Sequence, residues 1–110
     1  MIITSLLFGG FIMFDKENRY ITRGINEKID LQLQILLWSL VDNLKIEKDY
    51  LQVFKLSRAG DVINIEHTQE VPEYKSFIKI NAKDLEFNED IKIYVIDSGV
   101  YSTMLLPEEY

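Results

Sequence analysis

The chain has one histidine, and acidic side chains stand close to it in the sequence. His67 is followed by Glu70 and Glu73 in the segment HTQEVPE. A carboxylate that orients an imidazole ring can make it a general base, so this polar cluster would suit a small hydrolase. His67 is also in phase with Ile63 and Ile65 in an alternating segment. We therefore favour a structural histidine at the edge of the core, because single histidines near scattered carboxylates are common by chance.

No other residue pattern indicates a catalytic, metal or cofactor site. The spacing of His67, Glu70 and Glu73 matches no metal-ligand pattern that we can justify physically. The absence of cysteine excludes a disulfide framework, a thiolate zinc site and a cysteine nucleophile. The segment from Asp97 to Gly99 lacks the flanking glycines of a nucleophile elbow, and a hairpin turn explains it better. We therefore expect no enzyme activity, no cofactor and no metal ion.

The charge distribution disfavours a nucleic-acid partner. The chain has a formal net charge of -6, and residues 61–110 hold four lysines and eleven acidic residues. This half of the chain would repel phosphate groups. Arg19, Arg23 and Lys28 with Tyr20 form a small basic and aromatic group, which we interpret as a solvated strand edge.

The alternative function is an acidic inhibitor of a nucleic-acid-processing enzyme, of the mobile-element or phage type. Such mimicry requires a dense row of carboxylates on one surface. The candidates for that row are Glu66, Glu70, Glu73, Asp84, Glu86 and Glu89. Lysines are interspersed with these acids in the sequence, so we favour an ordinary solvated surface.

Hydrophobic periodicity predicts one helix and six short strands. The helix runs from Leu31 to about residue 45, with Asp30 as its N-cap. The strands are rich in β-branched and aromatic residues. They are expected at residues 19–23, 49–57, 62–68, 76–80, 91–96 and 101–106. The order β-α-β-β-β-β-β predicts an α+β fold, with one amphipathic helix packed on a mostly antiparallel sheet of five to six strands.

The expected helix has two apolar sides, although a helix that lies on a sheet needs only one. The main stripe contains residues that recur at steps of three and four: Leu33, Leu36, Leu37, Leu40, Val41 and Leu44. Leu31, Ile35 and Trp38 fall nearly opposite this stripe. Tryptophan is favoured at the centre of protein interfaces, so we expect these three residues to form a partner interface. The equal alternative is cover by the chain itself, through the segment around Phe14 or residues 104–106.

Residues 1–12 are expected to differ in role from the rest of the chain. The start MIITSLLFGGFI is too short for a membrane helix, and it lacks the basic start and cleavage site of a secretory signal. We interpret residues 1–12 as an N-terminal extension or edge segment, and residues 13–110 as a single α+β domain. The lack of cysteine suits a reducing cytoplasm, which is the expected location.

Five segments give the chain a resemblance to a known family. They are RYITRG, LQLQILLWSLVDNL, DYLQVFKL, HTQEVPEY and STMLLPEEY, and they lie between residues 19 and 110. The chain resembles a small uncharacterised family of Gram-positive bacterial and phage proteins, catalogued as domain of unknown function 960. The resemblance implies a bacterial or phage setting in the cytoplasm, but it implies no activity, cofactor or catalytic residue.

Together these observations favour a non-enzymatic module for protein–protein interaction, which is either a homodimer or an accessory protein with a protein partner. The interface would be centred on Leu31, Ile35 and Trp38. We expect no contact with a membrane. A hydrolase that uses His67 is the least favoured function.

Overall fold

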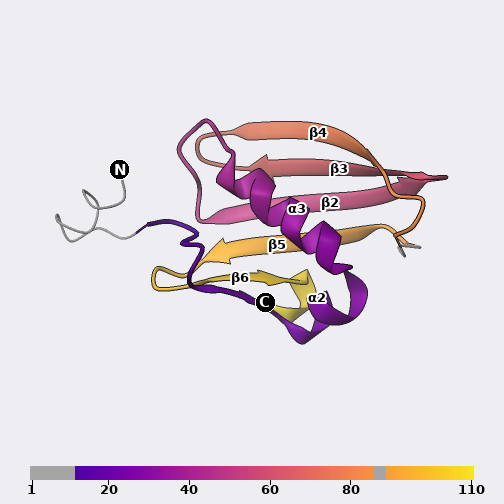
Figure 1. Cartoon of the computed structure of the whole chain (residues 1–110). Coiled ribbons are helices and arrows are strands. Elements are labelled where there is room, and N and C mark those ends of the chain that lie inside the picture. The colour runs from indigo at the N-terminus through magenta and orange to yellow at the C-terminus, as the bar shows by residue number, and fades with distance from the viewer. Residues whose placement is uncertain (1–11, 86–88) are drawn as a thin grey trace.

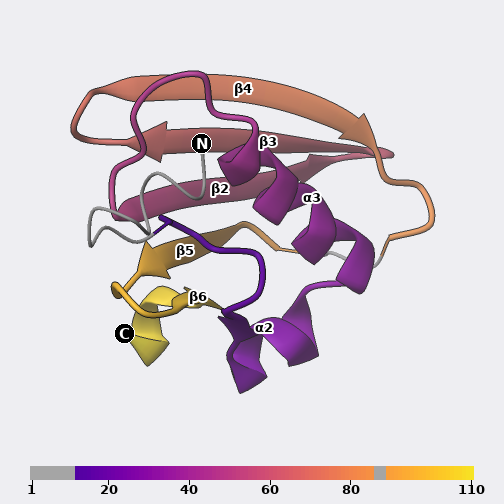
Figure 2. The same ribbon diagram turned by 60° about the vertical axis from the view of Figure 1, so that its left-hand side comes forward.

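The structure of the chain, a computed structural model, describes residues 12–85 and 89–110. It contains one six-stranded sheet with one main helix across one of its faces (Figures 1 and 2). This confirms the expected α+β class. The elements in chain order are β1 (Arg19–Ile21), α2 (Arg23–Lys28), α3 (Leu31–Asp42), β2 (Leu51–Ala59), β3 (Val62–Gln69), β4 (Tyr74–Asn81), β5 (Ile91–Asp97), β6 (Ser102–Leu105) and the 3-10 helix η1 (Pro107–Glu109).

The strands lie in the order β1-β6-β5-β2-β3-β4, so β2 is central and β4 is an edge strand. All neighbouring strands are antiparallel except β1 and β6, which are parallel. A strand alternates its side chains between the two faces of the sheet. Every second side chain therefore points toward α3, and these residues form the core with the inner side of that helix: Leu33, Leu37, Val41, Phe54, Leu56, Ile63, Ile65, Ile93, Val95 and Met104.

The short helix α2 lies where the sequence predicted the end of the first strand. Thr22 is its N-cap, because the Thr22 side-chain oxygen accepts a hydrogen bond from the Ile25 N–H at 3.3 Å. The first strand consequently ends at Ile21. A helix of six residues makes fewer than two turns, so apolar periodicity could not indicate it. Asp30 occupies the N-cap position of α3 as expected, but its side chain makes no capping hydrogen bond.

The C-terminal segment is hydrogen-bonded to the start of α2. The Glu109 carboxylate accepts hydrogen bonds from the Thr22 hydroxyl at 2.5 Å and from the backbone N–H groups of Gly24 at 3.0 Å and Leu106 at 2.9 Å. The hydrogen bond from Thr22 is the main cause that lowers the pKa of Glu109. A Cβ atom at position 24 would stand 2.7 Å from Glu109 Oε2, so a larger residue there would force the Glu109 and Leu106 side chains to shift.

The expectation for residues 1–12 falls outside the described residues, apart from Ile12. The described chain enters the fold through Phe14, which is buried in the core and donates its backbone N–H to Asp97 Oδ2 at 3.1 Å. A membrane-spanning helix needs about 20 apolar residues, and none of the helices in residues 12–85 and 89–110 meets that requirement.

Candidate functional site

His67 is buried in the core of the protein. It lies on the α3 side of β3 and is 3% exposed. Its ring stacks on Phe54, with the ring centroids 4.3 Å apart, and packs against Tyr74 in an edge-on arrangement. Burial removes water from the ring and lowers the pKa of His67 from 6.5 to about 4. The imidazole is therefore neutral at physiological pH.

His67 takes part in a buried network of amide side chains. His67 Nε2 lies 2.6 Å from Gln52 Oε1. The amide nitrogen of Gln52 donates to Asp49 O at 2.9 Å and to Gln69 Oε1 at 2.7 Å, so its oxygen is the group that faces His67. The neutral ring must then donate from Nε2. Gln69 donates in turn to one carbonyl in the loop before β2 and one in the β3–β4 turn, so the network ties these two segments together.

The polar cluster predicted from the sequence, His67 with Glu70 and Glu73, is not assembled. Glu70 and Glu73 are exposed in the turn between β3 and β4, whereas His67 is buried and bonds to Gln52. Among residues 12–85 and 89–110, no three histidine, aspartate or glutamate side chains gather as a metal ion would require. Gln52 and Gln69 were not predicted from the sequence as members of a polar network. The available signal was that both are in phase with the core-facing residues of their strands.

The helix surface predicted to bind a partner is covered at one end. Leu31 and Ile35 are 67% and 59% exposed on the outer side of α3. Trp38 is half-buried, because the Arg19 guanidinium lies over its ring at 4.5 Å from the centroid. An ion pair with Asp42 holds Arg19 in this position. Two aliphatic side chains therefore remain exposed on this side of the helix, and they form a small surface.

The described carboxylates proposed for nucleic-acid mimicry are distributed over both ends of the sheet. Glu66 lies in the middle of β3, and Glu70 and Glu73 lie at the β3–β4 turn. Asp84 and Glu89 follow β4 at its other end. A strand of eight residues spans roughly 26 Å, which separates the two groups. These five residues do not form one row, and the sixth candidate, Glu86, lies outside the described residues.

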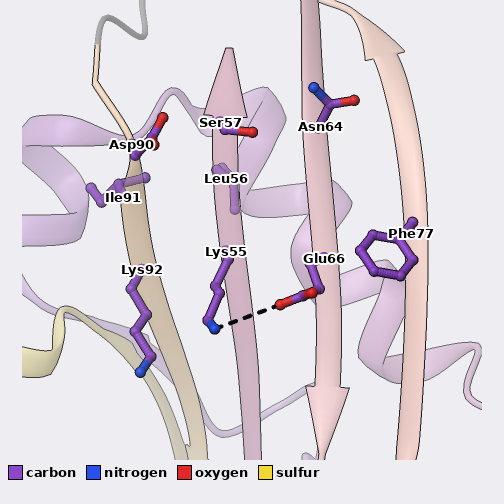
Figure 3. Close-up of a pocket in the computed structure, with 9 residues that line it drawn as sticks. All are labelled: Lys55, Leu56, Ser57, Asn64, Glu66, Phe77, Asp90, Ile91 and Lys92. Carbon is purple, nitrogen blue, oxygen red and sulfur yellow. Dashed lines mark ion pairs between the residues drawn. The ribbon is translucent and has the colours of Figure 1, made fainter. Parts of the chain in front are cut away.

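The sheet face away from α3 has no α-helix over it in the described part of the chain, and on its β5 side Tyr110, which follows η1, packs edge-on to Tyr94 (Figures 1 and 2). On this face the strand register aligns Lys92, Lys55, Glu66 and Phe77 in one row across β5, β2, β3 and β4 (Figure 3). Phe77 is 67% exposed in the middle of its strand. We use the name open face for the outward side chains of these four strands around this row: Lys55, Ser57, Asn64, Glu66, Lys75, Phe77, Lys79 and Lys92.

The open face has a surplus of positive charge, although the whole chain has a net charge of -6. Its only acidic side chain is Glu66, and the ammonium groups of Lys55 and Lys75 each lie 3.8 Å from that carboxylate. Lys79 and Lys92 form no ion pair within the described residues. Lys92 stands directly opposite Lys55 on the neighbouring strand. Like charges in this position destabilise a sheet.

A shallow depression of about 440 Å³ lies in the open face. Lys55 and Lys92 border it on one side and Phe77 on the other, with Glu66 between them and Ser57, Asn64 and Asp90 toward one end (Figure 3). The two ammonium groups, the hydroxyl and the amide can bind an acidic group, and the exposed ring can pack against an apolar one. This chemistry suits binding.

Comparisons with known proteins agree with this structure. A family model described as "Staphylococcal protein of unknown function (DUF960)" matches residues 18–109. A crystal structure of a protein of unknown function from Enterococcus faecalis is similar at a TM-score of 0.78 and 26% sequence identity, over 91% of this chain and 97% of that chain. No curated protein matches the chain.

Proposed function

The chain belongs to the DUF960 family, as its sequence segments predicted, and we propose that it is a non-enzymatic module that binds a protein partner through the open face. The observation that carries the proposal is the row of Lys92, Lys55, Glu66 and Phe77 on a sheet face that no described α-helix covers. The partner presents acidic side chains beside an apolar one.

The buried polar residues are occupied by hydrogen bonds within the fold, and this supports a binding role over a catalytic one. His67, Gln52 and Gln69 bond to one another and to backbone groups, and Arg19 bonds to Asp42. Buried polar groups with partners stabilise a fold. A general acid or base must instead reach the substrate, and the pKa of His67, at about 4, leaves it far from the operating range of such a group.

The lysines of the open face support an acidic partner. Lys55 and Lys92 repel each other across neighbouring strands, which costs the isolated protein some stability. A carboxylate placed between them would relieve this repulsion. Opposite charges across an interface favour encounter and exclude wrong partners, and an exposed ring such as Phe77 provides apolar contact area.

A protein partner suits this surface better than a nucleic acid does. Glu66 lies in the centre of the row of lysines and would face any phosphate backbone that crossed it. Acidic residues also stand at both ends of the strands, with Glu70 and Glu73 at one end and Asp84 and Asp90 at the other. A continuous polyanion would meet these charges, whereas a compact protein epitope can place its carboxylates at the lysines alone.

Nuclear magnetic resonance of the ¹⁵N-labelled protein tests the proposal. The probe is the capped tripeptide acetyl-Glu-Phe-Glu-amide, whose two carboxylates and ring complement the open face. We expect shifts of the amide signals of Lys55, Asn64, Phe77 and Lys92, with a dissociation constant of about 1–10 mM for so small a ligand. Acetyl-Lys-Phe-Lys-amide is the matched probe of opposite charge, and it should leave these signals unchanged.

Paired variants locate the binding surface. The double substitution Lys55→Gln with Lys92→Gln should abolish the shifts. The control Lys16→Gln with Lys45→Gln removes the same charge from exposed loop positions and should preserve them. Shifts confined to the outer side of α3, around Leu31 and Ile35, would show that the interface lies on the helix and would contradict the proposal. So would equal binding of both tripeptides.

A further inference from the structure

Strand β4 is one edge of the sheet, and among residues 12–85 and 89–110 its only neighbouring strand is β3 (Figure 1). Eight residues long, it is one of the longer strands of the sheet. An edge strand has unpaired backbone N–H and C=O groups along its outer side, and these can accept a further strand. The opposite edge, β1, has only three residues. β4 is therefore the edge with room for another strand.

Both faces of β4 are incompletely covered. Toward α3, Ile78 and Ile80 are only half-buried, although their neighbours Ile63 and Ile65 on β3 are fully buried. On the other face, Phe77 is 67% exposed. An additional strand beside β4 would cover apolar surface on both faces at once. A strand that only rested on the open face would leave Ile78 and Ile80 unchanged.

On the open face, the side chains of β4 form a basic, aromatic, basic pattern, and this pattern favours an acidic ligand. Lys75, Phe77 and Lys79 point to the open face in sequence, with Lys75 and Lys79 on either side of the ring. Neighbouring strands align their side chains in rows, so a seventh strand would place three side chains opposite these three. The complementary pattern is acidic, apolar and acidic at alternate positions.

We propose that β4 binds an extended acidic segment of the partner as a seventh strand of the sheet. The segment carries an acid–x–apolar–x–acid pattern, in which the acids pair with Lys75 and Lys79 and the apolar residue packs on Phe77. Backbone hydrogen bonds supply affinity and the alternate side chains supply specificity. This inference rests on the proposed function, because Phe77 belongs both to β4 and to the open face.

A second copy of the chain does not fit this edge. Antiparallel pairing of two β4 strands about Phe77 would place Lys75 of each copy opposite Lys79 of the other. The four lysines would then repel one another. Lysines on an edge strand commonly prevent such self-association. The same charges that exclude a copy attract an acidic segment, so the two effects act together.

Isothermal titration calorimetry with a capped peptide, Gly-Thr-Glu-Val-Phe-Thr-Glu-Gly, tests the inference. The peptide presents Glu, Phe and Glu on one face of a strand and Thr, Val and Thr on the other. We expect it to bind at least tenfold more tightly than the tripeptide, because it adds backbone hydrogen bonds and covers Ile78. Absence of binding at millimolar concentration would overturn the inference.

Two N-methylated peptides separate strand addition from simple contact with the open face. In a strand, alternate N–H groups point to the neighbour and away from it. One peptide carries N-methyl groups on Glu, Phe and Glu, and the other carries them on Thr, Val and Thr. Strand addition predicts that one of the two loses binding at least about tenfold while the other keeps it. Equal affinities would overturn strand addition while leaving the proposed function intact, provided that the tripeptide still shifts the open-face signals.

Charge variants complete the test. Lys75→Gln with Lys79→Gln should weaken binding of the long peptide by about tenfold. The control Lys16→Gln with Lys45→Gln carries the same net charge and should bind as the wild type does. Equal affinity of the two double variants would contradict the assigned register. Light scattering should show a monomer before the peptide is added, and a dimer would contradict the argument against a second copy.

Discussion

The two faces of the sheet use their polar residues in opposite ways. On the face that α3 covers, the side chains of His67, Gln52 and Gln69 hydrogen-bond to one another. On the open face, Lys55 and Lys92 stand opposite each other, and Lys92 has no carboxylate partner in the described chain (Figure 3). The first arrangement stabilises the fold, and the second lowers its stability.

This difference shows which residues point to function. A histidine near glutamates attracts attention in a sequence, yet His67 is fully used by the fold. The lysines of the open face look ordinary in the sequence, but the fold leaves their charge unbalanced. Residues that break a local rule of stability without a structural benefit are the better candidates for binding.

The largest expected effect on stability is at the centre of the covered face. Gln52→Ala removes a fully buried side chain, leaves His67 Nε2 without its acceptor and takes one hydrogen bond from Gln69. We expect the free energy of unfolding to fall by about 3–4 kcal/mol. Lys55→Gln on the same strand, but on the open face, should change it by less than about 0.5 kcal/mol. Urea denaturation measures the free energy of unfolding of both variants. Similar losses of stability for the two would contradict the difference between the two faces.

The neutral state of His67 predicts a pH dependence. Its pKa is 6.5 in the unfolded chain and about 4 in the fold, so between these values the unfolded state binds more protons. The free energy of unfolding should therefore fall as the pH is lowered from 6.5 to 4, by on the order of 3 kcal/mol from this residue. Below pH 4 this contribution should change no further.

The variant His67→Gln isolates that contribution, because other groups titrate equally in both proteins. The difference between the two stability profiles should slope through the window from pH 6.5 to 4 and be flat above it. A flat difference over the whole range would show that His67 is not held neutral. Imidazole ¹⁵N shifts should report the Nε2–H tautomer at neutral pH.

The contact between the C-terminal segment and α2 predicts a moderate effect. Gly24→Ala places a methyl group 2.7 Å from Glu109 Oε2 and from Leu106 Cδ1, so we expect a loss of about 1–3 kcal/mol. The loss in the double variant with Glu109→Ala should be smaller than the sum of the two single losses, because Glu109→Ala removes one of the two clashing side chains. Thermal unfolding measures the stability of the single and double variants. If the loss in the double variant equals the sum of the two single losses, residues 24 and 109 do not approach each other closely.

The smallest expected effect has the opposite sign. Lys92→Glu replaces the repulsion from Lys55 by an attraction, so the protein should become more stable by roughly 0.5 kcal/mol. The same variant should lose binding of the acidic tripeptide. Chemical denaturation and the tripeptide titration together check this pair of outcomes. A loss of stability would show that Lys92 contributes to the fold.

The sequence predicted the elements with a clear period and missed those without one. The strands and α3 were recognised because their apolar residues alternate or recur at helical steps. The short helix α2 has too few residues to show a period. Arg19 covers Trp38 although the two residues belong to different elements of the chain. Sequence periodicity describes a single element and does not predict such contacts.

The candidate surface could be predicted only in part. The alternation of Lys75, Phe77 and Lys79 is visible in the sequence and places the three on one face. The pairing of Lys55 with Lys92 depends on the register between β2 and β5, which are separated by two other strands in the chain. The partner of His67 depends in the same way on the register of β2 and β3. Register is a long-range property, so these pairs required the structure.

Parallel measurement of stability and peptide affinity for Lys55→Gln with Lys92→Gln tests the functional assignment of the open face most directly. We predict that this double variant unfolds at the wild-type denaturant concentration or above it, and that its affinity for the acidic tripeptide falls by at least about tenfold. Wild-type affinity in a stable double variant would show that these lysines belong to an ordinary solvated surface, and it would contradict the assignment.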